Sequence, residues 1–171
     1  NIATAVVAAE QFEVAGLPAI SPAAIAAGVA TCRWPGRLEA IRLAGTATTV
    51  LLDAAHNPAG CDALVAFLAE LDRPFTLLFG ALADKDVAAM LPPLAARASR
   101  VVLSRPASPR AADPAALAAL LPPGTAAALE PEIAAGLERA LTGGPELVVA
   151  CGSIFLIGTV RALLEARRAR G

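Results

Sequence analysis

The chain alternates between short apolar runs and longer segments whose apolar residues are spaced as on one face of a helix. Short apolar runs bounded by turn residues are typical of buried strands, and the longer segments are typical of helices packed on a core. The predicted strands cover residues 38–43, 48–52, 75–79, 100–103, 125–129 and 147–150. The predicted helices cover residues 1–13, 22–27, 58–71, 86–96, 114–121, 131–141 and 153–168.

This order of elements predicts an α/β domain of the Rossmann-like, three-layer kind. Near-continuous apolar strands that alternate with helices are typical of a mostly parallel sheet with helices on both faces. The first two strands are joined by a tight turn at 44–46, so we expect an opening hairpin that adds one antiparallel strand. The sheet should then contain about six strands.

The segment after the second predicted strand, Asp53 to Gly60, holds a carboxylate, the single histidine and an Asn-Pro helix start. Open α/β sheets bind their ligands beyond the carboxyl ends of the strands. Asp53 suits a ribose or a cation, although it would also suit a helix cap, for which Asn57 is better placed. A lone histidine is often a surface or core group, but the acid and the helix start beside His56 favour a ligand site.

Further connections should reach the same edge of the sheet, because they also follow parallel strands: 80–84, 104–113 and 151–153. In the last of these, Ser153 opens a helix whose free backbone N–H groups suit a carboxylate or phosphate, and it would act as an ordinary N-cap at the same time. Asp86 and Asp113 are also expected to cap helices. Arg33 and Arg37 flank a Pro-Gly turn, and arginine suits bidentate contacts with anions, although such a turn is by itself typical of a solvated loop.

Charge and hydropathy exclude two classes of protein. The net charge is −1, and basic residues form a block only near the C-terminus, at Arg167, Arg168 and Arg170, so we do not expect a nucleic-acid-binding protein. A membrane span needs roughly 18 consecutive apolar residues, and the strongest apolar run, 147–160, is shorter than that. We therefore expect no membrane-spanning helix.

The cysteines and two absent motifs limit the kinds of functional site that we expect in this chain. Cys32, Cys61 and Cys151 lie far apart and form no C-x-x-C pair, which fits a reducing cytoplasm and predicts small buried residues rather than metal ligands. The residues around Ser153 do not form a G-x-S-x-G elbow, and the chain contains no G-x-x-x-x-G-K-[ST] phosphate loop. This chain alone is therefore not expected to cradle phosphates.

Taken in order, five segments of the chain resemble the C-terminal domain of folylpolyglutamate synthase/dihydrofolate synthase, a family of the Mur ligase superfamily. The matching segments are Pro35-Gly36-Arg37-Leu38-Glu39 (P-G-R-[LM]-E), Asp53 to Gly60 (D-G-A-H-N-P-x-G), Phe79-Gly80 with Asp84-Lys85-Asp86 (F-G-x-x-x-D-K-D), Ser108-Pro109-Arg110-Ala111 (S-P-R-A) and Cys151 to Gly158 (G-S-L-Y-L-x-G).

The first of these segments is shared with the cell-wall Mur ligases, whereas the D-K-D segment and the last segment favour the folate branch. The chain departs from the pattern at two positions. Ala54 stands where glycine is usual, which would matter if that position needs a positive φ or a close ligand approach. Phe155 replaces the common tyrosine and loses its hydroxyl, so no catalytic role is assigned to it.

The resemblance implies ATP-dependent amide synthesis within folate metabolism. A central domain, which this chain lacks, would bind ATP and Mg²⁺ with its phosphate loop. A carboxylate of the folate or pteroate substrate would attack the γ-phosphate to give an acyl phosphate, and the amino group of L-glutamate would then displace phosphate. Closure of the two domains would assemble the site and exclude water.

The same resemblance implies roles for five residues. Asp53 would hold the ATP ribose, Arg37 would reach across the interdomain cleft to the ATP phosphates, and Asn1 would contact the adenine. His56 and Ser153 would bind the incoming glutamate, and Arg37 and His56 would be the catalytic residues. The chemistry of these side chains agrees, because arginine suits the charge on a transferring phosphoryl group, and an imidazole beside a helix N-terminus suits an anionic amino acid. No metal ligand is assigned to this chain.

The expected domain organisation also follows the resemblance. Residues 1–13 would be the last helix of the central ATPase domain, 14–36 a linker with a short helix, and 37–171 the Mur ligase C-terminal, glutamate-ligase domain. The partners would be ATP, L-glutamate, folate or dihydropteroate, and the N-terminal ATPase domain of the same parent chain, in the cytoplasm. The chain by itself should be inactive.

Two alternatives stay open. The chain could be the C-terminal domain of a cell-wall Mur-type amino-acid ligase, or a stand-alone α/β module that binds an anion or nucleotide without chemistry. Within the folate branch of the superfamily, dihydrofolate synthase, folylpolyglutamate synthase and a bifunctional enzyme are all compatible with the sequence.

Overall fold

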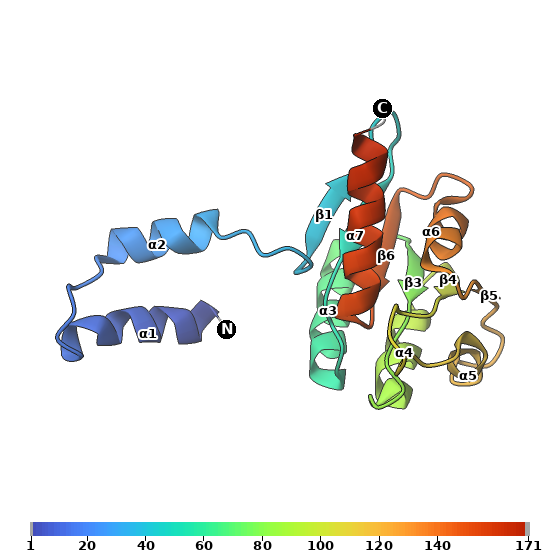
Figure 1. The fold of residues 1–171 in the computed structure, drawn as a ribbon, viewed down its shortest axis with the longest axis horizontal. Helices are drawn as coiled ribbons and strands as arrows, with labels where there is room; N and C mark the ends of the chain where they lie inside the picture. The colour runs from blue at the N-terminus through green and yellow to red at the C-terminus, as the bar shows by residue number, and fades with distance from the viewer. Residues whose placement is uncertain (1, 170–171) are drawn as a thin grey trace. The chain divides into compact units, whose positions relative to one another are not determined.

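The computed structural model describes residues 2–169, which divide into two compact units between Pro35 and Gly36. The first unit consists of two helices that lie side by side, α1 (Ile2–Val14) and α2 (Pro22–Thr31) (Figure 1). The predicted end of the second helix, at residue 27, was wrong. A single glycine at position 28 weakens a helix by only about 1 kcal/mol, so the alanine-rich segment continues as helix to Thr31.

The second unit is built on one six-stranded sheet with the order β1-β2-β6-β3-β4-β5. The strands are β1 (Glu39–Arg42), β2 (Thr49–Leu52), β3 (Thr76–Phe79), β4 (Arg100–Leu103), β5 (Ala127–Leu129) and β6 (Leu147–Cys151). β1 pairs antiparallel with β2, and every other pairing is parallel. The predicted hairpin and the mostly parallel sheet are thereby confirmed.

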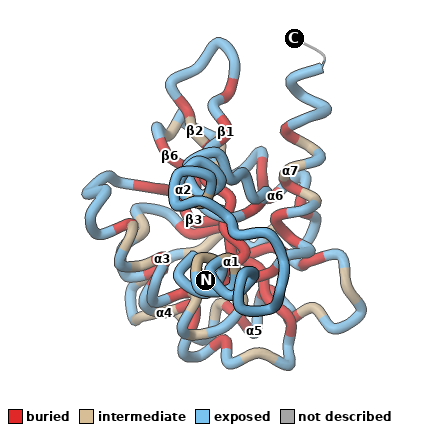
Figure 2. Tube along the Cα trace, turned by 90° about the vertical axis from the view of Figure 1, so that its left-hand side faces the viewer, coloured by how far each residue is buried: buried red, intermediate tan, exposed pale blue. Residues whose placement is uncertain are grey.

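Helices cover both faces of this sheet, as predicted. They are α3 (Pro58–Leu71), α4 (Val87–Ala95), α5 (Pro114–Ala118), α6 (Ile133–Leu141) and α7 (Ile154–Arg168). Alternate strand residues point to opposite faces, so Val149 packs with α3, α4 and α5, whereas Val148 and Ala150 pack with α6 and α7. The two resulting cores lie on opposite faces of the sheet, and buried residues gather along its strands (Figure 2).

Local signals account for the starts of most helices that cover the sheet. The side chains of Asn57, Asp86, Asp113 and Ser153 each accept a hydrogen bond from a backbone N–H in the first turn of the following helix. Helix α5 stops short of the predicted residue 121, because the chain tightens into i→i−3 hydrogen bonds before a Pro-Pro pair that disfavours helical backbone.

Backbone hydrogen bonds join the connections at the carboxyl ends of the parallel strands. The N–H of Gly152 donates to Ala55 O at 2.9 Å, and the N–H of Gly80 donates to Cys151 O at 3.3 Å. The N–H of Ser104 donates to the last residue of β3. The predicted gathering of these connections at one edge of the sheet is therefore confirmed.

Candidate functional site

The turn that carries Arg37 is held in one conformation by its neighbours. Gly36 is buried with a φ of 72°, and a Cβ at this position would lie 2.6 Å from Ile157 Cδ1. Its N–H donates to Glu39 Oε2 at 2.8 Å, and its carbonyl accepts from the N–H of Ala54 at 2.7 Å. Only glycine satisfies both the backbone conformation and the close approach of the Ile157 side chain.

Asp53 braces the same turn from the end of β2. The residue is 7% exposed, and its carboxylate accepts from the N–H of Leu38 at 3.0 Å and from the N–H of Ala55 at 2.8 Å. Leu38 has a φ of 45°, a conformation that costs a non-glycine residue about 1–2 kcal/mol. The helix cap at this junction is Asn57, whose Oδ1 accepts from the N–H of Gly60. Asp53 therefore supports the turn, and each of its oxygens keeps a further lone pair for a ligand.

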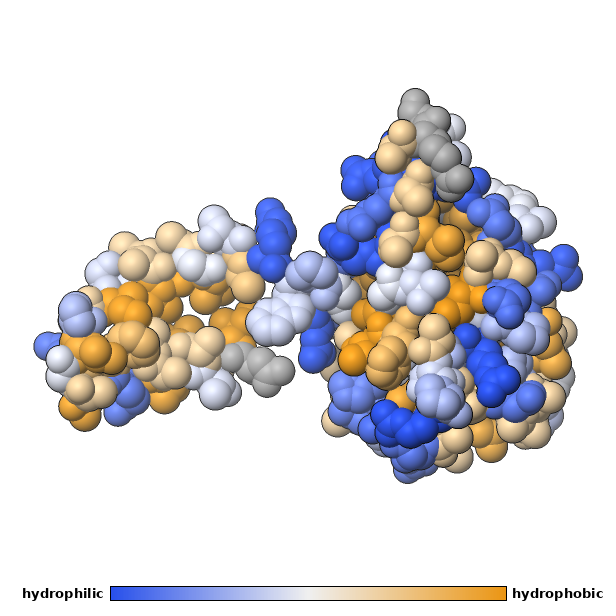
Figure 3. Space-filling model, in the orientation of Figure 1, coloured by the Kyte–Doolittle hydropathy of each residue, from blue (hydrophilic) through white to orange (hydrophobic). Residues whose placement is uncertain are grey.

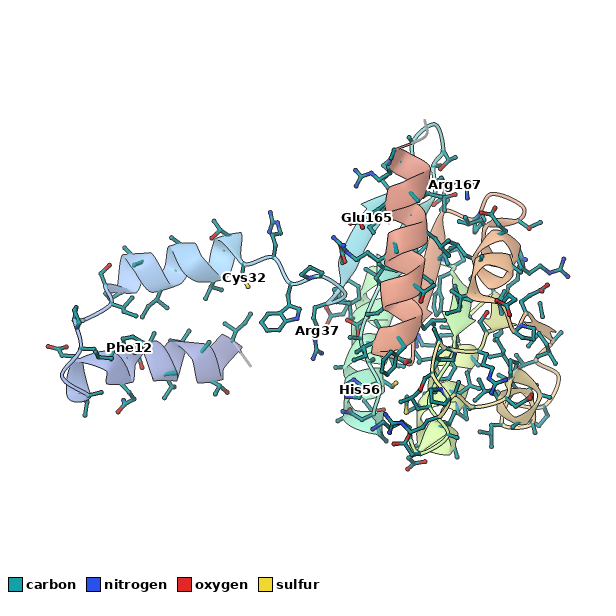
Figure 4. All side chains as sticks on the ribbon, viewed as in Figure 1. Phe12, Cys32, Arg37, His56, Glu165 and Arg167 are labelled. Carbon is teal, nitrogen blue, oxygen red and sulfur yellow. The ribbon has the colours of Figure 1, made fainter. Side chains whose placement is uncertain are left out.

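Arg37 lies between these two left-handed residues with its side chain exposed. No residue in the described range 2–169 forms a hydrogen bond or ion pair with its guanidinium group. The backbone of Arg37 is thus fixed while its charged group stays available for an anion. Figure 4 labels Arg37 on the turn before β1 and His56 at the start of α3.

His56 is half-buried, and its Nδ1 lies 2.7 Å from the carbonyl oxygen of Ala54. A carbonyl oxygen only accepts, so Nδ1 carries the proton in this contact. When the ring is neutral, its lone pair is therefore at Nε2. Ala54 itself is absent from the residues with positive φ, so alanine at the usual glycine position causes no backbone strain.

Ser153 is buried at the start of α7, where its hydroxyl accepts from the N–H of Phe155 at 3.2 Å. The preceding Gly152 has a φ of 102°, and a Cβ there would come within 2.7 Å of Gly80 O. The hydrogen bond from Gly152 to Ala55 connects this helix start to the segment that contains Asp53 and His56. The remaining free N–H groups of the first turn of α7 open at the same edge.

The structure thus joins four of the five predicted site residues through short backbone links. The Arg37 turn is bonded to the Asp53–Ala55 segment, and that segment is bonded to Gly152 beside Ser153. Asn1, the predicted adenine contact, lies outside the described residues. These contacts do not test the ligand roles of the five residues, which stay predictions.

The two loops that follow β3 and β4 pair with each other. The N–H of Ala83 donates to Arg110 O, and a bridge joins Leu82 to Ala111. Arg110 Nη1 also lies 3.2 Å from Asp84 Oδ2. This pairing between the two loops was not predicted from the sequence.

The two buried thiols belong to the core and not to the site. Burial raises the pKa of Cys61 to about 12, and the nearby carboxylates of Asp62 and Asp53 add to this effect. Burial also raises the pKa of Cys151 well above the ordinary thiol value. Both groups are therefore protonated at neutral pH and are poor nucleophiles. Cys32 is exposed, so the prediction that all three cysteines are buried was wrong for this one.

Within the described part of the chain, no group of three or more His, Cys, Asp or Glu side chains is arranged to hold a metal ion. No described helix is long and apolar enough to cross a membrane.

Comparison with protein families gives a match between residues 36–154 and the Mur ligase, glutamate ligase domain. The chain belongs to this family. In this Mur ligase domain, the matched region starts at the Gly36 turn and ends at Ile154, the first residue of α7. It therefore includes Arg37, His56 and Ser153.

Individual relatives agree with the family match. The chain is 42% identical to the folylpolyglutamate synthase of Lacticaseibacillus casei over 94 residues, which are 54% of this chain and 21% of that protein. E. coli FolC in complex with DHPP and ADP has a TM-score of 0.83 and 27% identity, covering 98% of this chain and 39% of that chain. A bifunctional folylpolyglutamate synthase/dihydrofolate synthase with Mn, AMPPNP and L-glutamate bound has a TM-score of 0.75 and 29% identity. The match covers 87% of this chain and 36% of that chain.

The chain thus spans about a fifth of the curated relative and under two-fifths of the solved ones. Two features of this Mur ligase domain were missed by sequence reasoning, namely the bracing of the Arg37 turn by Asp53 and by Glu39. The P-G-R-x-E and D-x-A-H-N-P segments were the available signals. Neither segment shows on its own that Asp53 and Glu39 support the Arg37 turn.

Proposed function

We propose that this chain is the glutamate-ligase domain of an enzyme that uses ATP to join L-glutamate to a folate or pteroate carboxylate. The observation that carries the proposal is the exposed Arg37, which has no side-chain partner among residues 2–169, on a turn that Asp53 and Glu39 brace. The names of the relatives support the same reaction class, because they are folylpolyglutamate and dihydrofolate synthases and two were solved with bound nucleotide.

The reaction would proceed in two steps. An oxygen of the substrate carboxylate attacks the γ-phosphorus of ATP, giving an acyl phosphate and ADP. The amino group of glutamate then attacks the acyl carbon, forms the amide bond and releases inorganic phosphate with loss of a proton. Domain closure would protect the acyl phosphate from water.

Arg37 would stabilise the negative charge on the transferring phosphoryl group, because its guanidinium group has no competing partner in the described chain. Asp53 would bind the ATP ribose with the lone pairs that remain on its carboxylate. Asn1 would contact the adenine.

His56 and Ser153 would bind the incoming glutamate. The Nε2 lone pair of neutral His56 suits a hydrogen bond from the glutamate amino group, because Nδ1 already donates to Ala54 O. The first turn of α7, opened by Ser153, suits a glutamate carboxylate.

Magnesium would be held elsewhere in the parent enzyme. The described residues offer no group of three or more His, Cys, Asp or Glu side chains that could hold the ion.

The proposed domain organisation assigns residues 1–13 to the end of a central ATPase domain, 14–36 to a linker and 37–171 to the glutamate-ligase domain. Neither α1 nor α2 contains a buried residue, although Ile2, Val7, Phe12 and Val29 are large and apolar. Figure 3 shows this apolar surface on the two-helix unit. Apolar side chains without a core of their own support packing against another domain of the parent.

The test uses the full-length parent protein with Mg-ATP, L-glutamate and either dihydropteroate or tetrahydrofolate. Mass spectrometry should detect a product that carries one added glutamate with at least one pterin, and none when ATP is omitted. Product formation only with a UDP-linked muramoyl substrate would place the chain in a cell-wall ligase. A folded parent that ligates neither substrate would contradict the proposal.

A further inference from the structure

The Arg37 turn has a second anchor on helix α7. Glu39, at the start of β1, accepts from the N–H of Gly36 and also from Arg161 Nε, which lies 3.1 Å from Oε1 and 3.2 Å from Oε2. One carboxylate therefore connects the backbone of the turn to a side chain of the helix. Charge-assisted hydrogen bonds of this kind are stronger than neutral ones.

The guanidinium group of Arg161 is itself held in place. Its Nη1 lies 2.7 Å from Glu165 Oε1, one helical turn further along α7. Arg161 therefore presents Nε to Glu39 in a defined direction, and the two carboxylates share its charge.

The same face of α7 contacts the turn at another point. Ile157 precedes Arg161 by four residues, so the two side chains lie on one face of the helix. Ile157 Cδ1 is the atom that fills the space where a Gly36 Cβ would lie. Two independent contacts on one helix face therefore fix the position of the turn.

The ion pair between Arg161 and Glu39 is less exposed than the other long-range ion pairs on the surface. The side chains of Arg161 and Glu39 are 36% and 23% exposed, whereas those of Arg167 and Glu138 are 50% and 65% exposed. The Arg167–Glu138 pair joins α7 to α6 and holds no backbone group of the turn. It offers a matched comparison on the same helix.

We propose that Arg161 is a positioning residue for Arg37 and acts through Glu39. The inference rests on the proposed function, in which Arg37 contacts the ATP phosphates. Without Arg161, the Glu39 carboxylate is free to turn toward solvent, and the N–H of Gly36 loses its fixed acceptor. Arg37 then occupies its productive orientation for a smaller fraction of the time. The effect falls on turnover more than on substrate affinity, because Arg37 acts on charge that develops during phosphoryl transfer.

The kinetic test compares Arg161→Gln with Arg167→Gln in the full-length parent. We expect Arg161→Gln to lower kcat about tenfold with KM for glutamate and folate within about twofold of wild type. Arg167→Gln should match wild type. Arg161→Lys keeps a positive charge near Glu39 and should recover part of the loss. Glu39→Gln should also lower kcat, and adding Arg161→Gln to it should cost little more.

A second measurement is independent of activity. Amide hydrogen exchange at Gly36 in the 171-residue chain should be about tenfold faster in Arg161→Gln, while exchange at Leu38, held by Asp53, changes less. Unchanged exchange at Gly36 together with kcat equal to that of Arg167→Gln would overturn the proposal. If Arg37→Ala keeps normal turnover, the proposed role of Arg37 fails, and exchange at Gly36 alone decides whether Arg161 holds the turn.

Discussion

Two constraints act on Gly36, a left-handed backbone and a close side-chain contact, and comparison with Gly45 separates them. Gly36 and Gly45 have nearly the same φ, 72° and 70°. A Cβ at Gly36 would meet Ile157 Cδ1 at 2.6 Å, whereas a Cβ at Gly45 would have no atom within 4 Å. The two positions therefore share the cost of the left-handed backbone, and only Gly36 adds a steric clash.

We expect Gly45→Ala to lower the free energy of unfolding by about 1–2 kcal/mol, the cost of the left-handed conformation for a residue with a Cβ. Gly36→Ala should cost about 1–3 kcal/mol more, because Ile157 has to move. Urea denaturation of both variants measures the difference. In an Ile157→Val background, which removes Cδ1, the two alanine substitutions should become closer in cost. If Gly45→Ala and Gly36→Ala lower the free energy of unfolding equally in the otherwise unchanged chain, the predicted clash with Ile157 is contradicted.

Residues differed in how well the sequence predicted their roles. Asn57 was recognisable as a helix cap, because an asparagine before a proline is a local signal. The bond from Leu38 to Asp53 spans 15 residues and depends on the register of the β1–β2 hairpin, in which Glu39 lies opposite Leu52. No local pattern reports such a contact, so the bracing role of Asp53 emerged only from the structure.

At the scale of elements, α6 has a side-chain cap at its C-terminal end and none at its N-terminal end. Its N-cap residue, Glu132, makes no side-chain capping bond. At the other end, Arg100 of β4 donates from Nη1 to Thr142 O at 2.6 Å and from Nη2 to Arg139 O at 3.0 Å. A cation at this position satisfies free carbonyl groups and interacts favourably with the helix dipole.

Arg100→Ala should therefore lower the free energy of unfolding by about 1–2 kcal/mol. The control is Arg73→Ala, which removes an exposed ion pair with Glu146 and should cost at most about 0.5 kcal/mol. Thermal or urea unfolding of the two variants gives the comparison. If Arg100→Ala costs no more than Arg73→Ala, the carbonyl contacts do not stabilise α6.

Element types followed from the hydrophobic pattern, because buried strands and amphipathic helices differ in period and length. The ends of helices were less predictable than their types. Helix α2 continued through Gly28, and α5 ended in a tight turn ahead of Pro122. In both cases the deciding factors were small local energies that the pattern of apolar residues does not report.

At the scale of the whole sheet, strand order brings the site together. The last strand, β6, lies between β2 and β3, so Gly152 and Ser153 come next to the segment that follows β2. The sequence predicted that these segments share an edge, since parallel strands end on the same side whatever their order. It did not predict which strands are neighbours, because the insertion of β6 depends on how the complete set of helices packs.

In the proposed function, this edge of the sheet delivers Arg37 to the phosphoryl group of ATP. The most direct measurement is kcat of the full-length parent carrying Arg37→Ala, in the glutamate-ligation assay. The control is Arg42→Ala, an exposed arginine at the far end of β1.

We predict that Arg37→Ala lowers kcat by about 10²–10³-fold, as for the loss of one preorganised group that stabilises transition-state charge. Its free energy of unfolding should stay close to that of wild type, because the guanidinium group has no partner in the described chain. Arg42→Ala should leave both quantities unchanged. Near-normal turnover of a folded Arg37→Ala enzyme would contradict the account.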